Sequence, residues 1–189
     1  MPVHLCKGDA QNKVAFILST PGKLEEEAEY PAAGDTGDNM NAILELLNKS
    51  DPNHFPNINR YRYLITNAST NVMHSAKGDK KTEEADSNIT EPQNICRVRM
   101  EVGHCTIVIL CGQKANLLAP HLKEKVLIRT SHLGNKGLRN KFKNKAPLLK
   151  GMSTGKERDA ARLKLCAQEI SDQLRSSFLE HAGAALRLT

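Results

Sequence analysis

The sequence has no hydrophobic run approaching the ~18 residues of a membrane-spanning helix, so we expect no transmembrane segment. Its first residues, Met1–Lys7, lack the basic and apolar stretches of a secretory signal peptide, and we therefore expect a cytoplasmic protein. No internal repeat and no linker divides the 189 residues. Residues 1–189 are thus predicted to form a single domain with a core of its own.

Paired cysteines are also missing. The five cysteines include no C-x-x-C pair, and their odd number argues against a disulfide framework: Cys6, Cys96, Cys105, Cys111 and Cys166. Cys105 and Cys111 border an apolar run, where burial as small hydrophobic residues is expected. We predict no metal ion and no cofactor. The chain also lacks a P-loop and a G-x-G-x-x-G pattern, which disfavours a nucleotide-binding module built on Gly34 and Gly37.

Positive charge is present but unevenly spread. Residues 121–150 hold nine Lys or Arg and one acid, a net of +8 in a chain whose total is +6, so the other residues carry −2. Such a concentration predicts a surface that binds a polyanion. The alternative is a basic loop that is merely solvated.

Apolar runs alternate with helical patterns along the chain. Four runs are predicted to be strands covered on both faces: Val14–Leu18, Tyr61–Ile65, Thr106–Leu110 and Val126–Ile128. Helices are predicted around residues 40–47 after an N-cap at Thr36 or Asp38, after the capping box Thr90-x-x-Gln93, over Gln113–Leu118, and over Lys156–His181. This order predicts an α/β fold, a three-layer α/β/α domain with a central, mostly parallel four-stranded sheet. Residues 71–89 are predicted to be a mobile polar loop.

The most specific motif follows the first predicted strand. It combines a Pro-Gly turn, two acids and a Gly-rich element: Pro21-Gly22, Glu25-Glu26, Pro31, Gly34 and Gly37. This block resembles the first motif of prokaryotic branches of the uracil-DNA glycosylase superfamily. Three later segments follow in that superfamily's order: Leu64–Ala68, then Thr106–Gly112 with Ala115, then Val126–Arg129 with Ser131-His132. The resemblance covers about residues 13–140.

The resemblance implies an enzyme that flips a base out of DNA and hydrolyses its N-glycosidic bond. This reaction needs a carboxylate near the sugar and a donor facing the leaving base. Many relatives place the acid shortly before Pro-Gly, where this chain has Ser19 and Thr20. A broad-specificity branch instead keeps an aspartate in a Gly-Asp-x-x-Gly element, which Asp35 matches. Asp35 is therefore predicted to be catalytic, with Asp38 and Glu25 as substitutes, and helix capping is the alternative role for Asp35.

The resemblance also assigns the groups that would contact the base. His132 would donate to the base oxygen, although the usual His-Pro-Ser is replaced here by His132-Leu133-Gly134. Asn67 would read the flipped base with its amide, and a turn-forming asparagine is the alternative. The remaining base contacts would come from Ser19, Thr20, Pro21 and Gly22.

Ala32 departs from the pattern of the relatives, which usually stack a Phe on uracil at this position. The smaller side chain predicts an enlarged pocket, unless Tyr30 substitutes for the Phe. Some relatives in bacterial antiphage defence remove glucosylated hydroxymethylcytosine, so a bulky modified pyrimidine in phage DNA is the expected substrate. The alternative is sequence drift in an ordinary repair enzyme that excises uracil or another deaminated base.

The resemblance further implies a DNA-facing loop over about residues 132–150. Leu133 is predicted to be the apolar wedge that fills the space of the flipped nucleotide, with DNA contacts from Asn135, Lys136, Arg139 and Lys141. Several relatives carry an iron–sulfur cluster, but the cysteine spacing here predicts none. The sequence thus predicts a monomeric, monofunctional DNA glycosylase that binds DNA and no membrane. A DNA-binding protein that kept the fold and lost catalysis is the alternative of another class.

Overall fold

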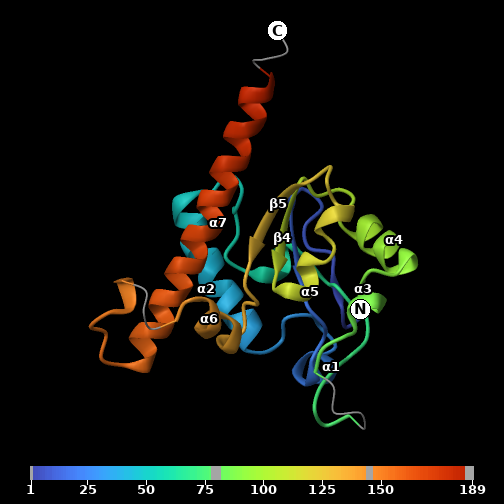
Figure 1. Ribbon diagram of the computed structural model, residues 1–189, viewed down its shortest axis with the longest axis horizontal. Coiled ribbons are helices and arrows are strands. Elements are labelled where there is room, and N and C mark those ends of the chain that lie inside the picture. Colours follow the sequence, from blue (N-terminus) through green and yellow to red (C-terminus); the bar gives the residue numbers. More distant parts are fainter. Residues whose placement is uncertain (1, 78–81, 144–146, 186–189) are drawn as a thin grey trace.

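The computed structural model describes residues 2–77, 82–143 and 147–185, and its centre is a five-stranded sheet of order β1-β3-β2-β4-β5 (Figure 1). Four strands run parallel: β2 (Val14–Leu18), β3 (Leu64–Asn67), β4 (Ile107–Cys111) and β5 (Val126–Thr130). The fifth, β1 (Leu5–Cys6), pairs antiparallel with β3. The predicted four-stranded sheet therefore lacked one edge strand, because two residues are too few to leave an apolar pattern.

Helices cover both faces of the sheet (Figure 1). One face packs on α2 (Asp35–Ser50), α6 (Asn135–Lys141) and α7 (Gly155–Ala185), and the other on α3 (Asp86–Ile89), α4 (Pro92–Glu101) and α5 (Gln113–Asn116). Along β2, Phe16 lies in the first core and Ile17 in the second, because successive strand residues point to opposite faces. Both faces are dry, which is why the strands are apolar throughout. The predicted three-layer α/β/α domain is confirmed.

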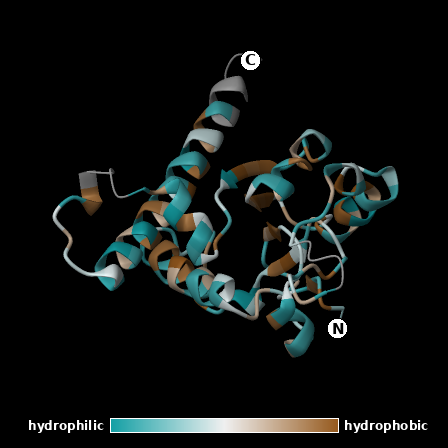
Figure 2. Cartoon of the chain, turned by 60° about the horizontal axis from the view of Figure 1, so that its bottom comes forward, coloured by the Kyte–Doolittle hydropathy of each residue, from teal (hydrophilic) through white to brown (hydrophobic). Residues whose placement is uncertain are grey.

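The long helix α7 packs across the sheet with one side only. Ile170 and Leu174 are buried in the core with α2, whereas Phe178 and Leu179 further along are exposed. Hydrophobic and hydrophilic residues alternate along this helix in Figure 2, as expected for a helix with one buried side. Its carboxyl-terminal end projects beyond the rest of the molecule in Figure 1. No helix in the described part of the chain is both long and apolar enough to cross a membrane.

Several boundaries of helices and strands differ from those predicted. β3 begins at Leu64 rather than Tyr61, because residues Arg60–Arg62 form the short 3-10 helix η1. The capping box predicted at Thr90 is wrong, since Thr90 ends α3 and Glu91 is the N-cap of α4. Similarly, Gly34, and not Thr36 or Asp38, is the N-cap of α2.

Two segments predicted as loops contain helices. The basic loop over residues 132–150 holds α6 and the 3-10 helix η3 (Pro147–Leu149), with residues 144–146 outside the described part. The polar segment 71–89 holds α3, and residues 78–81 lie outside the description. Within it Glu84 is only 6% exposed, which nothing in the polar sequence around it predicts.

Candidate functional site

Three of the residues singled out by sequence lie at the carboxyl ends of the parallel strands. Ser19 follows β2, Asn67 is the last residue of β3, and His132 comes two residues after β5. Because parallel strands end at the same edge, these side chains from distant parts of the chain meet there. This edge is where open α/β sheets place their ligand sites.

Two adjoining cavities open at this edge. The inner cavity has a volume of about 180 Å³ and is walled by Asn67, Glu25 and Met73 among others. The outer cleft measures about 1230 Å³ and extends over Asp35, Gly112 and the face of α6. The residues common to both walls mark the mouth between them: Ser19, Thr36, Thr82, Glu83 and His132.

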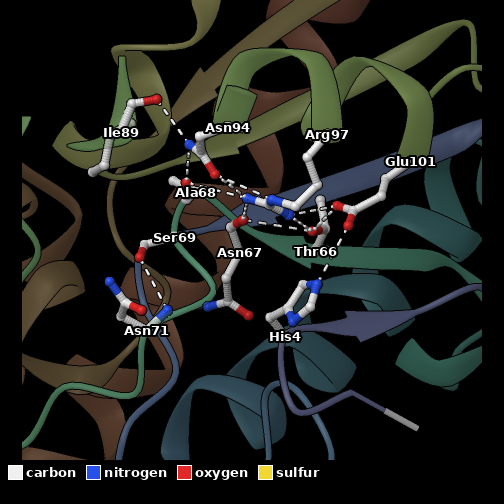
Figure 3. A network of polar contacts seen from close by, with 10 residues as sticks. All are labelled: His4, Thr66, Asn67, Ala68, Ser69, Asn71, Ile89, Asn94, Arg97 and Glu101. Atoms are coloured by element: carbon white, nitrogen blue, oxygen red, sulfur yellow. Dashed lines mark hydrogen bonds and ion pairs between the residues drawn. The ribbon is translucent and has the colours of Figure 1, made fainter. Parts of the chain in front are cut away.

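Asn67 contributes an unsatisfied polar group to the inner cavity. The residue is 2% exposed, and its side-chain Oδ1 has no hydrogen-bond partner among the described residues. Leaving a buried polar atom unpaired costs about 1–3 kcal/mol, so this oxygen is available to accept from a ligand or a water in the cavity. Figure 3 shows the amide pointing away from the polar network that holds the Asn67 backbone. The turn-forming role considered for Asn67 does not account for this placement.

That network clamps the end of β3 to α4 (Figure 3). Arg97 donates from Nη2 to the carbonyl oxygen of Asn67 at 2.9 Å and from Nη1 to the carboxylate of Glu101 at 2.7 Å. Glu101 also accepts from the Thr66 hydroxyl at 2.6 Å and pairs with His4 at 3.3 Å. Burial raises the pKa of Glu101, but these hydrogen bonds and the Arg97 charge outweigh it and leave the pKa below its ordinary value. The backbone of Asn67 is thereby fixed from behind.

His132 presents a defined hydrogen-bond donor at the mouth. Its Nδ1 accepts from the backbone N–H of Gly134 at 3.0 Å, so the neutral ring carries its proton on Nε2. Burial lowers the pKa of His132, while the charges of Glu83 and Glu25 act to raise it, and the net shift is downward. The ring is therefore neutral near pH 7 and offers an Nε2–H donor. The backbone here is tightly packed: a Cβ at Gly137 would lie 2.2 Å from the His132 carbonyl oxygen.

The predicted carboxylates differ in their surroundings. Asp35 is the first residue of α2 and follows the N-cap Gly34, so it does not occupy the N-cap position considered for it. Its Oδ2 accepts from Asn135 Nδ2 at 2.8 Å, and it lines the outer cleft only. Glu25 uses both oxygens as acceptors, from the backbone N–H groups of Gly22 at 3.0 Å and Ala33 at 3.2 Å. Asp38 lies 4.0 Å from Arg60 with a side chain 82% exposed, and it lines neither cavity.

The segment after β3 supplies the rest of the wall, and sequence reasoning missed it. The Glu84 carboxylate accepts hydrogen bonds from Ser69, Asn71 and Asn88 side chains and from the Ala85 backbone. Burial raises the pKa of Glu84, but these donors outweigh it and the net pKa is lowered. This anchor holds Thr82 and Glu83 at the mouth. The segment carries no hydrophobic periodicity, so no pattern in the sequence could have identified Glu84 as buried.

The segment that precedes α2, which includes the short helix α1 (Lys23–Ala28), contributes less than predicted. Thr20 and Gly22 line the inner cavity, but Pro21 does not, and its carbonyl oxygen instead accepts from the Met73 N–H at 2.8 Å. Ala32 is 0% exposed, belongs to the hydrophobic core at φ 56°, and lines neither cavity. The prediction that Ala32 opens the base pocket is therefore wrong. Tyr30 is 44% exposed and packs on Tyr61 rather than on the cavity.

The predicted DNA contacts are also revised. Leu133 is 0% exposed in the core, so it is not available as a wedge, and its carbonyl oxygen accepts from Asn39 at 2.8 Å. Arg139 pairs with Asp159 at 2.7 Å and Lys141 with Glu169 at 2.6 Å, both acids being on α7. Lys136 is exposed on the cleft and has no ion-pair partner among the described residues. Asn135 bridges Asp35 and Asn39 across the start of α6.

Comparison with known protein families and with curated proteins found no match for this chain. Among the described residues, no group of three or more His, Cys, Asp or Glu side chains is arranged to hold a metal ion. The cysteines Cys6, Cys105, Cys111 and Cys166 are buried, and Cys96 is exposed. Burial raises the pKa of the Cys105 and Cys166 thiols to about 11, so neither is a nucleophile at neutral pH. The polar side chains that line the two cavities include Asn67 and Glu25 in the inner cavity, Asp35 in the outer cleft, and Glu83 and His132 in both.

Proposed function

We propose that the protein is a monofunctional DNA glycosylase that takes a flipped base into the inner cavity and hydrolyses its N-glycosidic bond. The observation that carries this proposal is that Asn67 and His132 line the same small cavity. An unpartnered amide and a neutral imidazole with its proton on Nε2 offer an acceptor and donors to the edge of a heterocyclic base. The resemblance to the uracil-DNA glycosylase superfamily had selected the same two residues.

The size of the inner cavity supports a single planar base as ligand. Its 180 Å³ lies below the roughly 300–1,000 Å³ of pockets that hold drug-sized ligands. Such a cavity is too small for a whole nucleotide, which would leave the sugar at the mouth and the phosphates in the outer cleft. Base removal inside DNA requires this kind of extrusion.

The groups at the mouth fit the charges of the reaction. As the bond to the sugar breaks, negative charge grows on the base and positive charge on the sugar. The His132 Nε2–H would stabilise the negative charge on the base. A carboxylate at the mouth would stabilise the positive charge on the sugar and orient water. No lysine lines the inner cavity within the described residues, which fits hydrolysis by water rather than through a Schiff base.

DNA would lie along the outer cleft. This cleft is bordered by the positively charged end of α6 and by Lys114, and the surrounding segment 121–150 has a net charge of +8. The ion pairs of Arg139 and Lys141 are on the surface and are worth only about 0–1 kcal/mol each, so phosphates can compete for these cations.

The substrate proposed is a pyrimidine with a bulky 5-substituent, such as glucosylated hydroxymethylcytosine, whose substituent would extend into the outer cleft. The volume of the outer cleft, 1230 Å³, supports this bulky substrate. Ala32 does not support it, because the residue is buried in the core. A second candidate is uracil or another base without a large substituent. The burial of Ala32 and the small inner cavity favour this second candidate.

The test is a set of DNA duplexes carrying uracil, hypoxanthine, 5-hydroxymethylcytosine or its glucosylated form, scored for abasic sites by alkaline strand cleavage. We expect abasic sites from at least one modified strand, and a loss of about 10²-fold in Asn67→Ala. Salt-sensitive DNA binding without abasic sites on any duplex would support the non-catalytic DNA-binding protein instead. Strand cleavage without alkali would contradict the monofunctional assignment.

A further inference from the structure

We propose that Glu83 is the catalytic carboxylate that activates the water, an assignment that rests on the proposed glycosylase function. Sequence reasoning gave this role to Asp35, and the structure allows the carboxylates near the site to be compared by their contacts. The comparison turns on two questions: whether a carboxylate stands where the sugar must lie, and whether its oxygens are free to hold a water.

The position of Glu83 answers the first question. With a base in the inner cavity and phosphates in the outer cleft, the sugar lies at the mouth between them. Glu83 lines both cavities, as His132 does, whereas Asp35 lines the outer cleft only and Asp38 lines neither. Glu83 and His132 are therefore both placed at the mouth that the two cavities share.

The contacts answer the second question. Glu25 faces the inner cavity, but both of its oxygens accept backbone N–H groups that hold the loop around Pro21 and Ala32. Asp35 accepts from Asn135, whose own Oδ1 accepts from Asn39 at 3.0 Å, and this chain fastens α6 to α2. Glu83 makes no hydrogen bond or ion pair within the described part of the chain, so both of its oxygens can accept from a water.

The neighbouring residue explains how an exposed side chain can be positioned. Glu84 is 6% exposed and accepts four hydrogen bonds, from Ser69 and Asn71 after β3 and from Ala85 and Asn88 at α3. Fixing the backbone of residue 84 restricts where residue 83 can reach. Glu83 thus combines unpaired carboxylate oxygens with a backbone that is anchored at the next residue, so it can accept a proton from a water held at the mouth.

In the proposed reaction, the water oxygen forms a bond to the anomeric carbon of the sugar while Glu83 takes a proton from that water. The bond from the sugar to the base nitrogen breaks, and its electron pair leaves with the base. The His132 Nε2–H stabilises this anion by hydrogen bonding. The base anion then takes up one proton, and Glu83 returns its proton to solvent, so the products are a free base and an abasic site.

The experiment compares single-turnover excision by wild-type protein, Glu83→Gln, Glu83→Ala and Glu124→Gln on the duplex that wild type cleaves fastest. Glu124 is a matched control, because it is exposed, lies before β5 at the opposite edge of the sheet, and lines neither cavity. We expect Glu83→Gln to lose about 10²-fold or more. It should bind DNA at least as tightly as wild type, because a negative charge is removed. Glu124→Gln should keep the wild-type rate.

Chemical rescue by formate distinguishes a catalytic role of Glu83 from a structural one. Formate is small enough to occupy the space left in Glu83→Ala, and we expect it to restore part of the rate there and to leave Glu124→Gln unchanged. The loss in Asp35→Asn should be smaller than that in Glu83→Gln. Circular dichroism melting checks that each variant folds. Near-wild-type excision by Glu83→Gln would overturn this assignment alone, whereas a wild-type protein that releases no base from any duplex would overturn the glycosylase function itself.

Discussion

At the scale of single residues, one hydrogen bond decides what His132 can do. The N–H of Gly134 occupies Nδ1, so the neutral ring must carry its proton on Nε2, and burial keeps the ring neutral. Protonation would place a second proton on Nδ1, opposite the Gly134 N–H, and break this contact. The donor at the mouth is therefore well oriented only above the pKa of His132.

This predicts how excision responds to pH. The rate should be constant near pH 7 and fall as the pH drops through the pKa of His132, which lies below its ordinary 6.5. His132→Ala should lose about 10²-fold at neutral pH, because a preorganised donor is removed. The measurement is single-turnover excision from pH 5 to 8, with DNA affinity followed in parallel as a control. A rate that rises steadily toward pH 5 would contradict the neutral-donor role.

At the scale of elements, α6 carries the positive charge beside the cleft, but its cations are not equivalent. Lys136 has no partner in the described residues, whereas Lys141 lies 2.6 Å from Glu169 on α7. A cation that already has a partner releases fewer counterions from DNA than a free one. The sequence shows both lysines as equal members of one basic stretch.

The prediction for α6 is a difference in salt dependence. Lys136→Ala should weaken DNA binding uniformly across sequences and reduce the slope of log K against log salt by about 1. Lys141→Ala should change the slope less, because Glu169 already neutralises Lys141. Fluorescence anisotropy at several salt concentrations measures both variants. Equal slopes for the two variants would show that DNA displaces Glu169 from Lys141.

The polar contacts between β3 and α4 are a second feature at the scale of elements. Arg97 donates to the carbonyl oxygens of Asn67 at 2.9 Å and of Ala68 at 3.3 Å, while Glu101 holds its guanidinium. The helix on the far face of the sheet therefore positions the backbone of a residue that faces the cavity. The sequence showed α4 only as an amphipathic helix.

At the scale of the whole molecule, two carboxylates, one buried and one half-buried, connect separate segments. Glu84 joins the end of β3 to α3, and Glu101 joins α4 to β3 and to His4 in the amino-terminal segment. The pKa of each lies below the ordinary value of 4.5 in the folded protein, because hydrogen bonds to the charged form outweigh burial. Their stabilising contribution is therefore full above about pH 4.5 and is lost as the pH falls through the folded-state pKa.

This predicts an acid-sensitive fold. The melting temperature of wild type should fall below about pH 4.5, the ordinary value from which both pKa values are lowered. The double variant Glu84→Gln with Glu101→Gln should have a lower melting temperature than wild type at pH 7. Its melting temperature should fall less on acidification, because the two groups that titrate are gone. Glu124→Gln, whose side chain is exposed, should follow wild type. If acidification lowers the melting temperature of the double variant as much as that of wild type, other carboxylates are responsible for the effect.

The sequence by itself determined the layers of this protein. Burial on both faces of a parallel sheet requires continuous apolar runs, and these predicted β2, β4 and the start of β5 within a residue. Because strands joined by helical crossovers run parallel, their carboxyl ends, and with them Ser19, Asn67 and His132, come to one edge. These are consequences of hydrophobic periodicity and chain direction, which can be read locally.

Only the tertiary structure decided what each polar group does. Whether Ala32 and Leu133 face the cavity or the core depends on how their loops pack, and both lie in the core. Whether Arg139 and Lys141 are free depends on α7, which follows them in the chain and pairs with both. Glu83 and Glu84 are adjacent in a polar segment, yet one is exposed at the mouth and the other is buried among donors. Partners of this kind come from distant segments, and no local pattern in the sequence records them.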